Sequence, residues 1–200
     1  GGRGIFNIEK KFKEIQQASL QWHLYWNMGY YYSHTSYECR DTRQWYPSGY
    51  DNHPNNTTEE TAIVVSGKTI TYKTRIHGPI IGLKAQSNWK EISFQLRGWG
   101  SPFMTIKDDD FHLRRKYPKI SKASHTGILV GSELTASVPL SPYSNIELSG
   151  FMTYTKGNNG IQTQTNYTDS TLTTVESIST IRHAFYALQY GLKIGVVYAF

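Results

Sequence analysis

The stretch SLQWHLYWNMGYYYSH, residues 19–34, alternates between two kinds of side chain. Its even positions are bulky and mostly apolar, whereas polar or small residues occupy most of the odd positions. Successive side chains of a β-strand point to opposite faces, so the pattern predicts a strand with one apolar and one polar side. The stretch exceeds the about five or six residues that are usual in soluble proteins. The apolar positions are Leu20, Trp22, Leu24, Trp26, Met28, Tyr30 and Tyr32.

The same period of two returns along most of the chain, and it predicts an all-β protein with about seven or eight strands. A helical period has weak support only in IEKKFKEIQQ, residues 8–17. The clearest further strands are TITYKTRI (69–76), EISFQLRGW (91–99), ILVGSELTASV (128–138) and NIELSGFMTYT (145–155).

The connections between these strands alternate in length. SPYSN, residues 141–145, is a tight turn, whereas residues 40–61 and 156–180 are long polar segments that we expect to be loops. Short turns at one end and long loops at the other are typical of a transmembrane β-barrel. The last stretch, residues 183–200, alternates and ends on Phe200, which resembles the assembly signal of bacterial outer-membrane barrels. A soluble β-sandwich also alternates, but strand length, aromatic residues near strand ends and this C-terminus favour the barrel.

Composition narrows the range of partners. The 200 residues carry a net charge of +6, yet the basic residues are scattered and their runs, EKKFKE and HLRRK, are short. A solvated surface explains these runs better than a nucleic-acid site, so we expect no nucleic-acid partner. The single cysteine, Cys39, excludes an internal disulfide and a cysteine-based zinc cluster.

The stretch TIKDDDFHLRRK, residues 105–116, concentrates three of the chain's 15 acidic residues. In an extended chain Asp108, Asp110 and His112 share one face, and Asp109 lies on the other. An aspartate beside a histidine can fix the imidazole tautomer and stabilise the imidazolium after it takes a proton from water. A solvated acidic loop is the plain alternative. The case for a metal site in this run is weak, because consecutive residues point to opposite sides of a strand. We therefore expect no metal.

The segment from Gly67 to His112 resembles the omptin family, the outer-membrane endopeptidases of Gram-negative bacteria. The rest of the chain, through Phe200, follows the family's final strands. The elements that carry the resemblance are Gly67, Tyr72-Lys73-Thr74-Arg75, Pro79, Ile81-Gly82-Leu83 and Asp110-Phe111-His112.

The resemblance implies an antiparallel transmembrane β-barrel, with residues 1–200 as a single domain or as the C-terminal part of one. It implies that Asp110 and His112 form the catalytic dyad and that Asp108 helps to select a basic side chain, Arg or Lys, before the cleaved bond. It also implies that Arg75 and Tyr30 contact lipopolysaccharide. This lipid would activate the protein, and no cofactor is expected. The resemblance implies a further basic contact beyond the dyad, for which Lys119 and Lys122 are the two candidates.

The chain departs from the family in one respect that concerns activity. Omptins place a second pair of aspartates on the opposite wall of the site, but no Asp-x-Asp precedes Lys107, and Asp41 and Asp51 are isolated. Tyr32 and His34 stand where the family has an acid and a base. The chain thus looks like the C-terminal two-thirds of an omptin: an incomplete sequence, a degraded gene product, or a barrel with a rebuilt first part.

Two functions remain open. The first is an endopeptidase of the bacterial outer membrane that cleaves peptides or proteins next to basic residues with water activated by His112, its active-site loops facing the exterior. The second is a non-catalytic outer-membrane barrel, an adhesin or a structural remnant.

Overall fold

The computed structural model describes residues 1–17, 20–46, 61–113, 118–169 and 171–198. All strands of this part of the chain belong to one antiparallel sheet, which confirms the predicted all-β class. No helix long and apolar enough to cross a membrane occurs among these residues. The strands are β1 (Gly2–Gln17), β2 (Leu20–Tyr46), β3 (Thr61–Trp89), β4 (Ile92–His112), β5 (Lys119–Ser141), β6 (Ser144–Gly157), β7 (Gly160–Tyr167), β8 (Val175–His183) and β9 (Tyr186–Tyr198).

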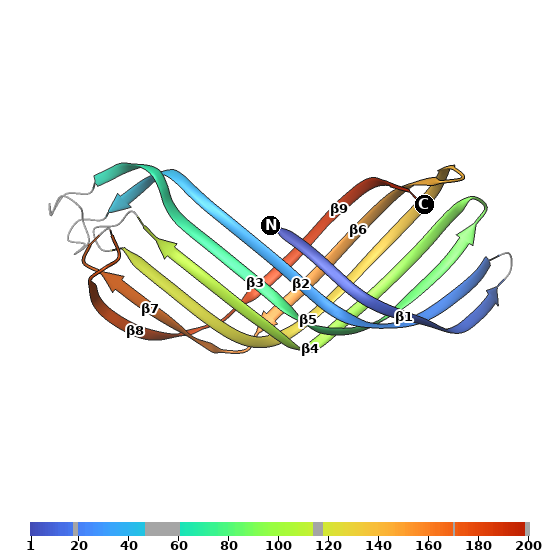
Figure 1. Ribbon diagram of the computed structural model, residues 1–200, viewed down its shortest axis with the longest axis horizontal. Coiled ribbons are helices and arrows are strands. Elements are labelled where there is room, and N and C mark those ends of the chain that lie inside the picture. Colours follow the sequence, from blue (N-terminus) through green and yellow to red (C-terminus); the bar gives the residue numbers. More distant parts are fainter. Residues whose placement is uncertain (18–19, 47–60, 114–117, 170, 199–200) are drawn as a thin grey trace.

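The sheet follows chain order from β1 to β6 and then continues to β9, while β7 pairs with β5 and β8. Strands β6 and β7 follow one another along β5, and β9 and β8 follow one another along that pair (Figure 1). The sheet is strongly curved, as shown by side chains from strands far apart in this order that meet on its inner face. Arg3 of β1 donates to the Thr153 hydroxyl of β6 at 3.4 Å, and the Tyr31 hydroxyl of β2 donates to Gln189 of β9 at 3.4 Å.

Three sequence predictions need correction or restriction. Residues 8–17 are part of β1, so the weak helical period there is wrong, since pairing with β2 decides the conformation. Within the expected loop 156–180, residues 160–167 form β7 and β8 begins at Val175, so this segment is not one long loop. Polar residues dominate both strands, and the apolar Val175, Ile178 and Ile181 of β8 do not fall on one alternating set, which hides the period. Their many threonines nevertheless suit a strand. Of the other expected loop, 40–61, residues 40–46 belong to β2 and Thr61 begins β3. Residues 47–60, the basic residues 114–116 and Phe200 lie outside the described residues.

A belt of apolar side chains runs across the outer face of the sheet, from strand to strand. Its members are neighbours in the strand register, as with Ile8, Met28 and Ile81 on β1, β2 and β3. Leu192 and Ile194 are 82% and 79% exposed, in the outward direction that the alternation predicts. Apolar side chains that point outward suit a wall in contact with lipid. The belt includes Phe6, Ile8, Met28, Ile81, Leu83, Leu96, Val130, Leu134, Leu148, Met152, Leu188, Leu192 and Ile194.

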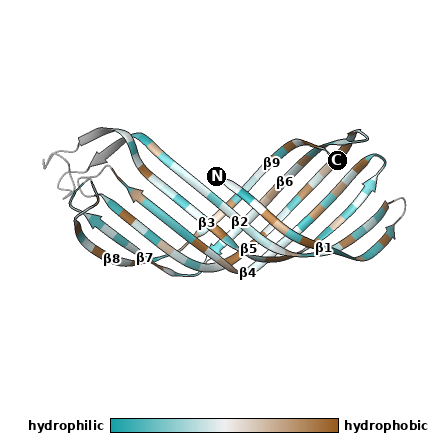
Figure 2. Ribbon diagram, in the orientation of Figure 1, coloured by the Kyte–Doolittle hydropathy of each residue, from teal (hydrophilic) through white to brown (hydrophobic). Residues whose placement is uncertain are grey.

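Residues that point to the inner face alternate along each strand with residues of the belt, so hydrophobic and hydrophilic residues follow one another (Figure 2). Tyr31, for example, is fully buried between the exposed Tyr30 and Tyr32. Apolar side chains on the inner face form a core that supports the site described below. This core consists of Tyr31, Ile76, Ile80, Trp99, Met104, Ile106, Leu129 and Phe185.

A cluster of charged side chains lies on the inner face of the sheet, at the level of the apolar belt. Glu9 of β1 forms ion pairs with Lys84 of β3 and with Arg97 of β4, the latter at 2.7 Å. The side chains of Glu9, Lys84 and Arg97 are only 22%, 10% and 18% exposed. Because β1 is hydrogen-bonded to β2, these ion pairs join it to two strands that its own backbone pairing does not reach.

Candidate active site at the polar end of the sheet

The acidic run lies at the end of β4, beyond the apolar belt. At its level the outward positions of β3, β4 and β5 are polar and exposed, as shown by Arg75, Lys107 and Lys122. The run therefore lies outside the membrane-spanning segments. It is extended, with Asp108 buried on the inner face, whereas Asp109 points outward and accepts from Arg75 at 2.9 Å. This is the division of faces that the sequence predicts.

Asp110 and His112 are in direct contact. The Nε2 atom of His112 lies 2.9 Å from Oδ2 of Asp110. An ionised carboxylate can only accept, so Nε2 carries the proton and Nδ1 keeps a lone pair. The side chains are 19% and 29% exposed, so solvent reaches both. A backbone hydrogen bond from Leu113 to the Thr69 carbonyl oxygen at 3.0 Å fixes the strand just beyond the pair.

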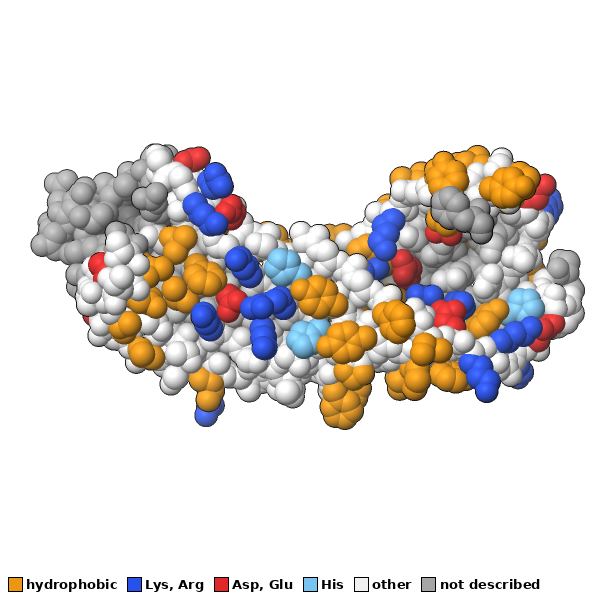
Figure 3. All heavy atoms as spheres, viewed as in Figure 1, with side chains coloured by type: hydrophobic (Ala, Val, Ile, Leu, Met, Phe, Trp, Pro, Cys, Tyr) orange, Lys and Arg blue, Asp and Glu red, His pale blue; other side chains and the backbone are white. Residues whose placement is uncertain are grey.

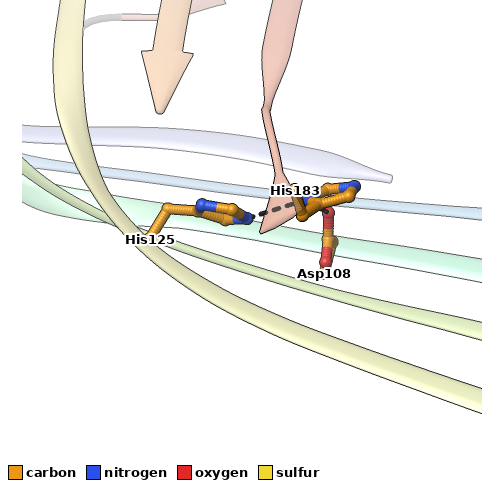
Figure 4. Close-up of side chains that lie close together, drawn as sticks. All are labelled: Asp108, His125 and His183. Carbon is orange, nitrogen blue, oxygen red and sulfur yellow. Dashed lines mark hydrogen bonds and ion pairs between the residues drawn. The ribbon is translucent and has the colours of Figure 1, made fainter. Parts of the chain in front are cut away.

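Asp108 lies in a second group of side chains. The Tyr72 hydroxyl of β3 donates to its Oδ2 at 3.4 Å, and His183 Nδ1 of β8 lies 3.6 Å from the same oxygen. His125 of β5 extends the group, because its Nε2 lies 2.9 Å from His183 Nδ1 (Figure 4). Sequence reasoning missed both histidines. Only the strand register reveals His125, because it places Ala123 beside Asp108 and His125 two residues further on the same face.

Burial is the main influence on Asp108. Loss of solvent raises the pKa of its carboxyl group, while His183, His125 and Tyr72 act in the opposite direction. The side chain is only 2% exposed, and its Oδ1 has no hydrogen-bond partner among the described residues. The neighbours of Asp108 thus offset only part of the cost of burying its carboxylate.

A cleft of about 300 Å³ opens beside this group. Tyr72 belongs to both the cleft and the group around Asp108, because it lines the cleft and its hydroxyl contacts Asp108. The cleft is large enough for one amino-acid side chain. Its walls are Thr35, Tyr37, Tyr72, Thr74, Ile76, Phe185, Tyr186, Ala187, Leu188 and Gln189.

The outer wall at this end carries a basic patch, defined by Lys73, Arg75, Lys107 and Lys122 around Asp109. Register places Lys73 and Lys122 on either side of Asp109, with Arg75 beside Lys107. Basic side chains gather beside histidines and hydrophobic side chains near the middle of the face in Figure 3.

Arg75 points outward, on the face of β3 opposite the apolar Ile76. Ile76 is inside the core at 2% exposure, because beyond the belt the apolar face of β3 turns inward and the polar face meets water. Tyr30 lies on the same outer wall nearer the belt, where its hydroxyl is 2.6 Å from Nδ1 of His77. Of the two candidate lysines after the acidic run, Lys122 is exposed beside Asp109 and Lys119 is half-buried. Asp41 accepts from the Gly67 amide at 2.7 Å, and Asp51 lies outside the described residues.

A curved antiparallel sheet with long strands, an apolar outer belt and charged side chains inside is the architecture of a membrane β-barrel protein. The model of the omptin family matches residues 6–200, and the chain belongs to that family. The family and the belt together place it in an outer membrane.

Among solved structures, the fold is similar to the crystal structure of the outer membrane protease OmpT from Escherichia coli, with a TM-score of 0.71. Sequence identity is 16%, and the match covers 99% of this chain and 64% of that chain. This chain therefore spans just under two-thirds of the length of the solved protease, and at this identity the likeness concerns the fold. No curated protein matches the chain.

Proposed function

We propose that the chain belongs to an outer-membrane endopeptidase in which His112 activates water. The observation that carries this proposal is the 2.9 Å contact between His112 Nε2 and Asp110 Oδ2 in a chain of this family. The free Nδ1 atom would take a proton from water, and the resulting hydroxide would attack the peptide carbonyl carbon. Asp110 would stabilise the imidazolium, which then returns the proton to the leaving amine.

The proposed substrates are peptides or proteins with Arg or Lys before the cleaved bond. Asp108 supports this preference, because it is a carboxylate on the same face as the dyad and beside the cleft. At 2% exposure it is covered by Tyr72 and His183, so it would attract a basic side chain mainly through its charge. Tyr72 would then form the contact surface for the aliphatic part of that side chain.

A non-catalytic outer-membrane barrel is the second candidate, an adhesin or a structural remnant. One observation favours it: no Asp-x-Asp precedes Lys107 within these 200 residues, which therefore do not supply the carboxylate pair that the resemblance implies for the opposite wall of the site. Without that pair, water beside His112 would be held from one side only.

A cleavage assay separates the two candidates. The protein is folded in detergent with lipopolysaccharide and given fluorogenic peptides that differ only in Arg, Lys, Gln or Ala before the scissile bond. We expect cleavage of the Arg and Lys peptides and little of the other two. Equal cleavage of all four would remove the basic preference, and no cleavage of any would favour the non-catalytic barrel.

We also propose that the basic patch binds phosphate groups of lipopolysaccharide and that this end of the sheet faces the exterior. The patch has four cationic side chains around one carboxylate and lies just beyond the apolar belt, at the expected depth of lipid headgroups. Arg75 has the geometry for paired hydrogen bonds to phosphate oxygens, and Tyr30 supplies a hydroxyl nearer the belt.

Replacing Arg75 with alanine should weaken lipopolysaccharide binding by about 10–100-fold, because a hydrogen bond to a charged group contributes about 1.5–3 kcal/mol. Arg75→Lys should give an intermediate loss, since an ammonium group cannot form the paired contact. Titration of the detergent-folded protein with lipopolysaccharide measures both. Lys90→Ala, at the turn after β3, is the matched control and should bind normally. Unchanged binding by Arg75→Ala would eliminate the assignment.

A further inference from the structure

Asp108, His125 and His183 converge on one point inside the sheet (Figure 4). One possible ligand atom from each lies within 4.8 Å of the other two. Asp108 and His125 are buried, and His183 is partly buried. They come from β4, β5 and β8, so the group is fixed by the sheet and not by a single loop.

The register explains how two histidines from strands that are not neighbours can meet. Gly160 of β7 pairs with His183 and lies beside His125, so it stands between them. A Cβ atom at residue 160 would be 2.2 Å from Nδ1 of His125. The glycine thus leaves the space in which the two imidazoles approach each other.

The hydrogen bonds of His125 determine which of its nitrogens is free. Its Nδ1 lies 3.0 Å from the carbonyl oxygen of Asn158, which can only accept, so Nδ1 carries the proton. Its Nε2 therefore presents a lone pair. A backbone carbonyl that fixes the tautomer in this way is a usual outer partner of a metal-binding histidine.

His183 Nδ1 faces two acceptors at once. It lies 2.9 Å from Nε2 of His125, which carries the lone pair, and 3.6 Å from Asp108 Oδ2. Without a metal, a proton on this nitrogen would sit among lone pairs that belong to two other side chains. A cation in the place of that proton would satisfy all three groups together.

The unpartnered oxygen of Asp108 is independent evidence for a cation. Oδ1 is buried with no hydrogen-bond partner among the described residues, and no described Lys or Arg forms an ion pair with this carboxylate. A buried carboxylate without compensation is costly, because its charge has lost water and gained little in return.

We propose that Asp108, His125 and His183 bind a divalent zinc ion. Bond lengths of about 2.0–2.2 Å in a tetrahedron place neighbouring ligand atoms about 3.3–3.5 Å apart, and the separations of 2.9 and 3.6 Å lie on either side of that value. Two imidazoles and one carboxylate suit zinc better than calcium or magnesium, which prefer oxygen ligands. Three protein ligands leave a fourth position for water.

This site goes beyond the proposed protease, because it uses neither Asp110 nor His112 and needs no peptide. It also gives Asp108 two competing partners. A bound zinc ion would neutralise the carboxylate that is proposed to attract a basic side chain, so zinc and a basic substrate should exclude one another at Asp108.

The test is calorimetric titration of the metal-free chain, folded in detergent without an affinity tag or peptide. We expect one Zn²⁺ per chain and no heat from Mg²⁺ or Ca²⁺. Titration with Co²⁺ should give the strong visible absorption of a tetrahedral site, which reports directly on geometry. Absence of saturable Zn²⁺ binding would overturn the proposal.

Variants locate the ion. His125→Ala, His183→Ala and Asp108→Asn should each weaken binding more than about 100-fold, since losing even an outer partner costs about 10–100-fold. Gly160→Ala keeps every ligand but displaces His125, and it should lower affinity and alter the Co²⁺ spectrum. His23→Ala is the matched control at the other end of the sheet.

The dyad offers a rival location, and His112→Ala tests it. This variant should bind Zn²⁺ normally. If it loses binding while His125→Ala keeps it, the ion lies at Asp110 and His112 and the proposal is wrong. Circular dichroism of each variant shows whether the sheet has formed. Because no peptide is present, the result does not depend on whether the protein is a protease.

Discussion

Replacing His112 with alanine is expected to reduce peptide cleavage by about 10²–10⁴-fold, the usual contribution of a positioned general base. His112 is the residue of the dyad that would hold the proton of the attacking water, and Asp110 can orient that water only through it. The loss should appear in kcat, with KM nearly unchanged, because the imidazole acts in the chemical step and the cleft beside Tyr72 remains intact.

A matched histidine controls for general effects of the substitution. His23 lies 3.4 Å from Glu14 near the opposite end of the sheet, and His23→Ala should leave cleavage unchanged. If His112→Ala cleaves the Arg peptide as fast as the parent protein, the general base lies elsewhere. His183 would then be the first residue to test, since it also contacts an aspartate.

Glu9→Gln is expected to lower the free energy of unfolding by about 3 kcal/mol. Removing one partner of a buried ion pair costs about 3–5 kcal/mol, and the partial exposure of Glu9, Lys84 and Arg97 argues for the lower end. The substitution leaves two cations inside the sheet without their carboxylate. It also breaks the link between β1 and strands β3 and β4. Urea unfolding of the detergent-folded protein, followed by tryptophan fluorescence, measures the change.

The control for this prediction is Glu38→Gln. Glu38 also pairs with a lysine and an arginine, but those pairs are exposed, and solvent screens them. Its unfolding midpoint should match that of the parent protein. A double variant with Lys84→Met should recover part of the stability lost in Glu9→Gln, because one unpaired cation is removed. Equal stability of Glu9→Gln and the parent would show that the cluster does not hold β1 in place.

Much of the fold could be predicted from the sequence because a wall between lipid and polar interior imposes its period on every strand that crosses the membrane. The pattern that begins at Leu20 shows this most clearly from Trp26 to Tyr32, where the even residues are exposed and Asn27 and Tyr31 are buried. Strands β7 and β8 could not be predicted in this way, because polar residues dominate them and their few apolar residues do not alternate regularly. Alternation within β3 also leaves open which face meets lipid near Ile76, since an apolar residue beyond the belt belongs to the core.

The sequence by itself determined that Asp108, Asp110 and His112 share a face, since that relation depends only on alternation along one extended segment. Their catalytic roles stay proposals. Only the tertiary structure brought His125 and His183 to Asp108. Residues from β5 and β8 meet β4 through the register of several strand pairs and through the space left by Gly160, and each register depends on contacts that are remote in sequence. Local alternation decides the direction of a side chain, but only strand pairing decides which side chains it faces.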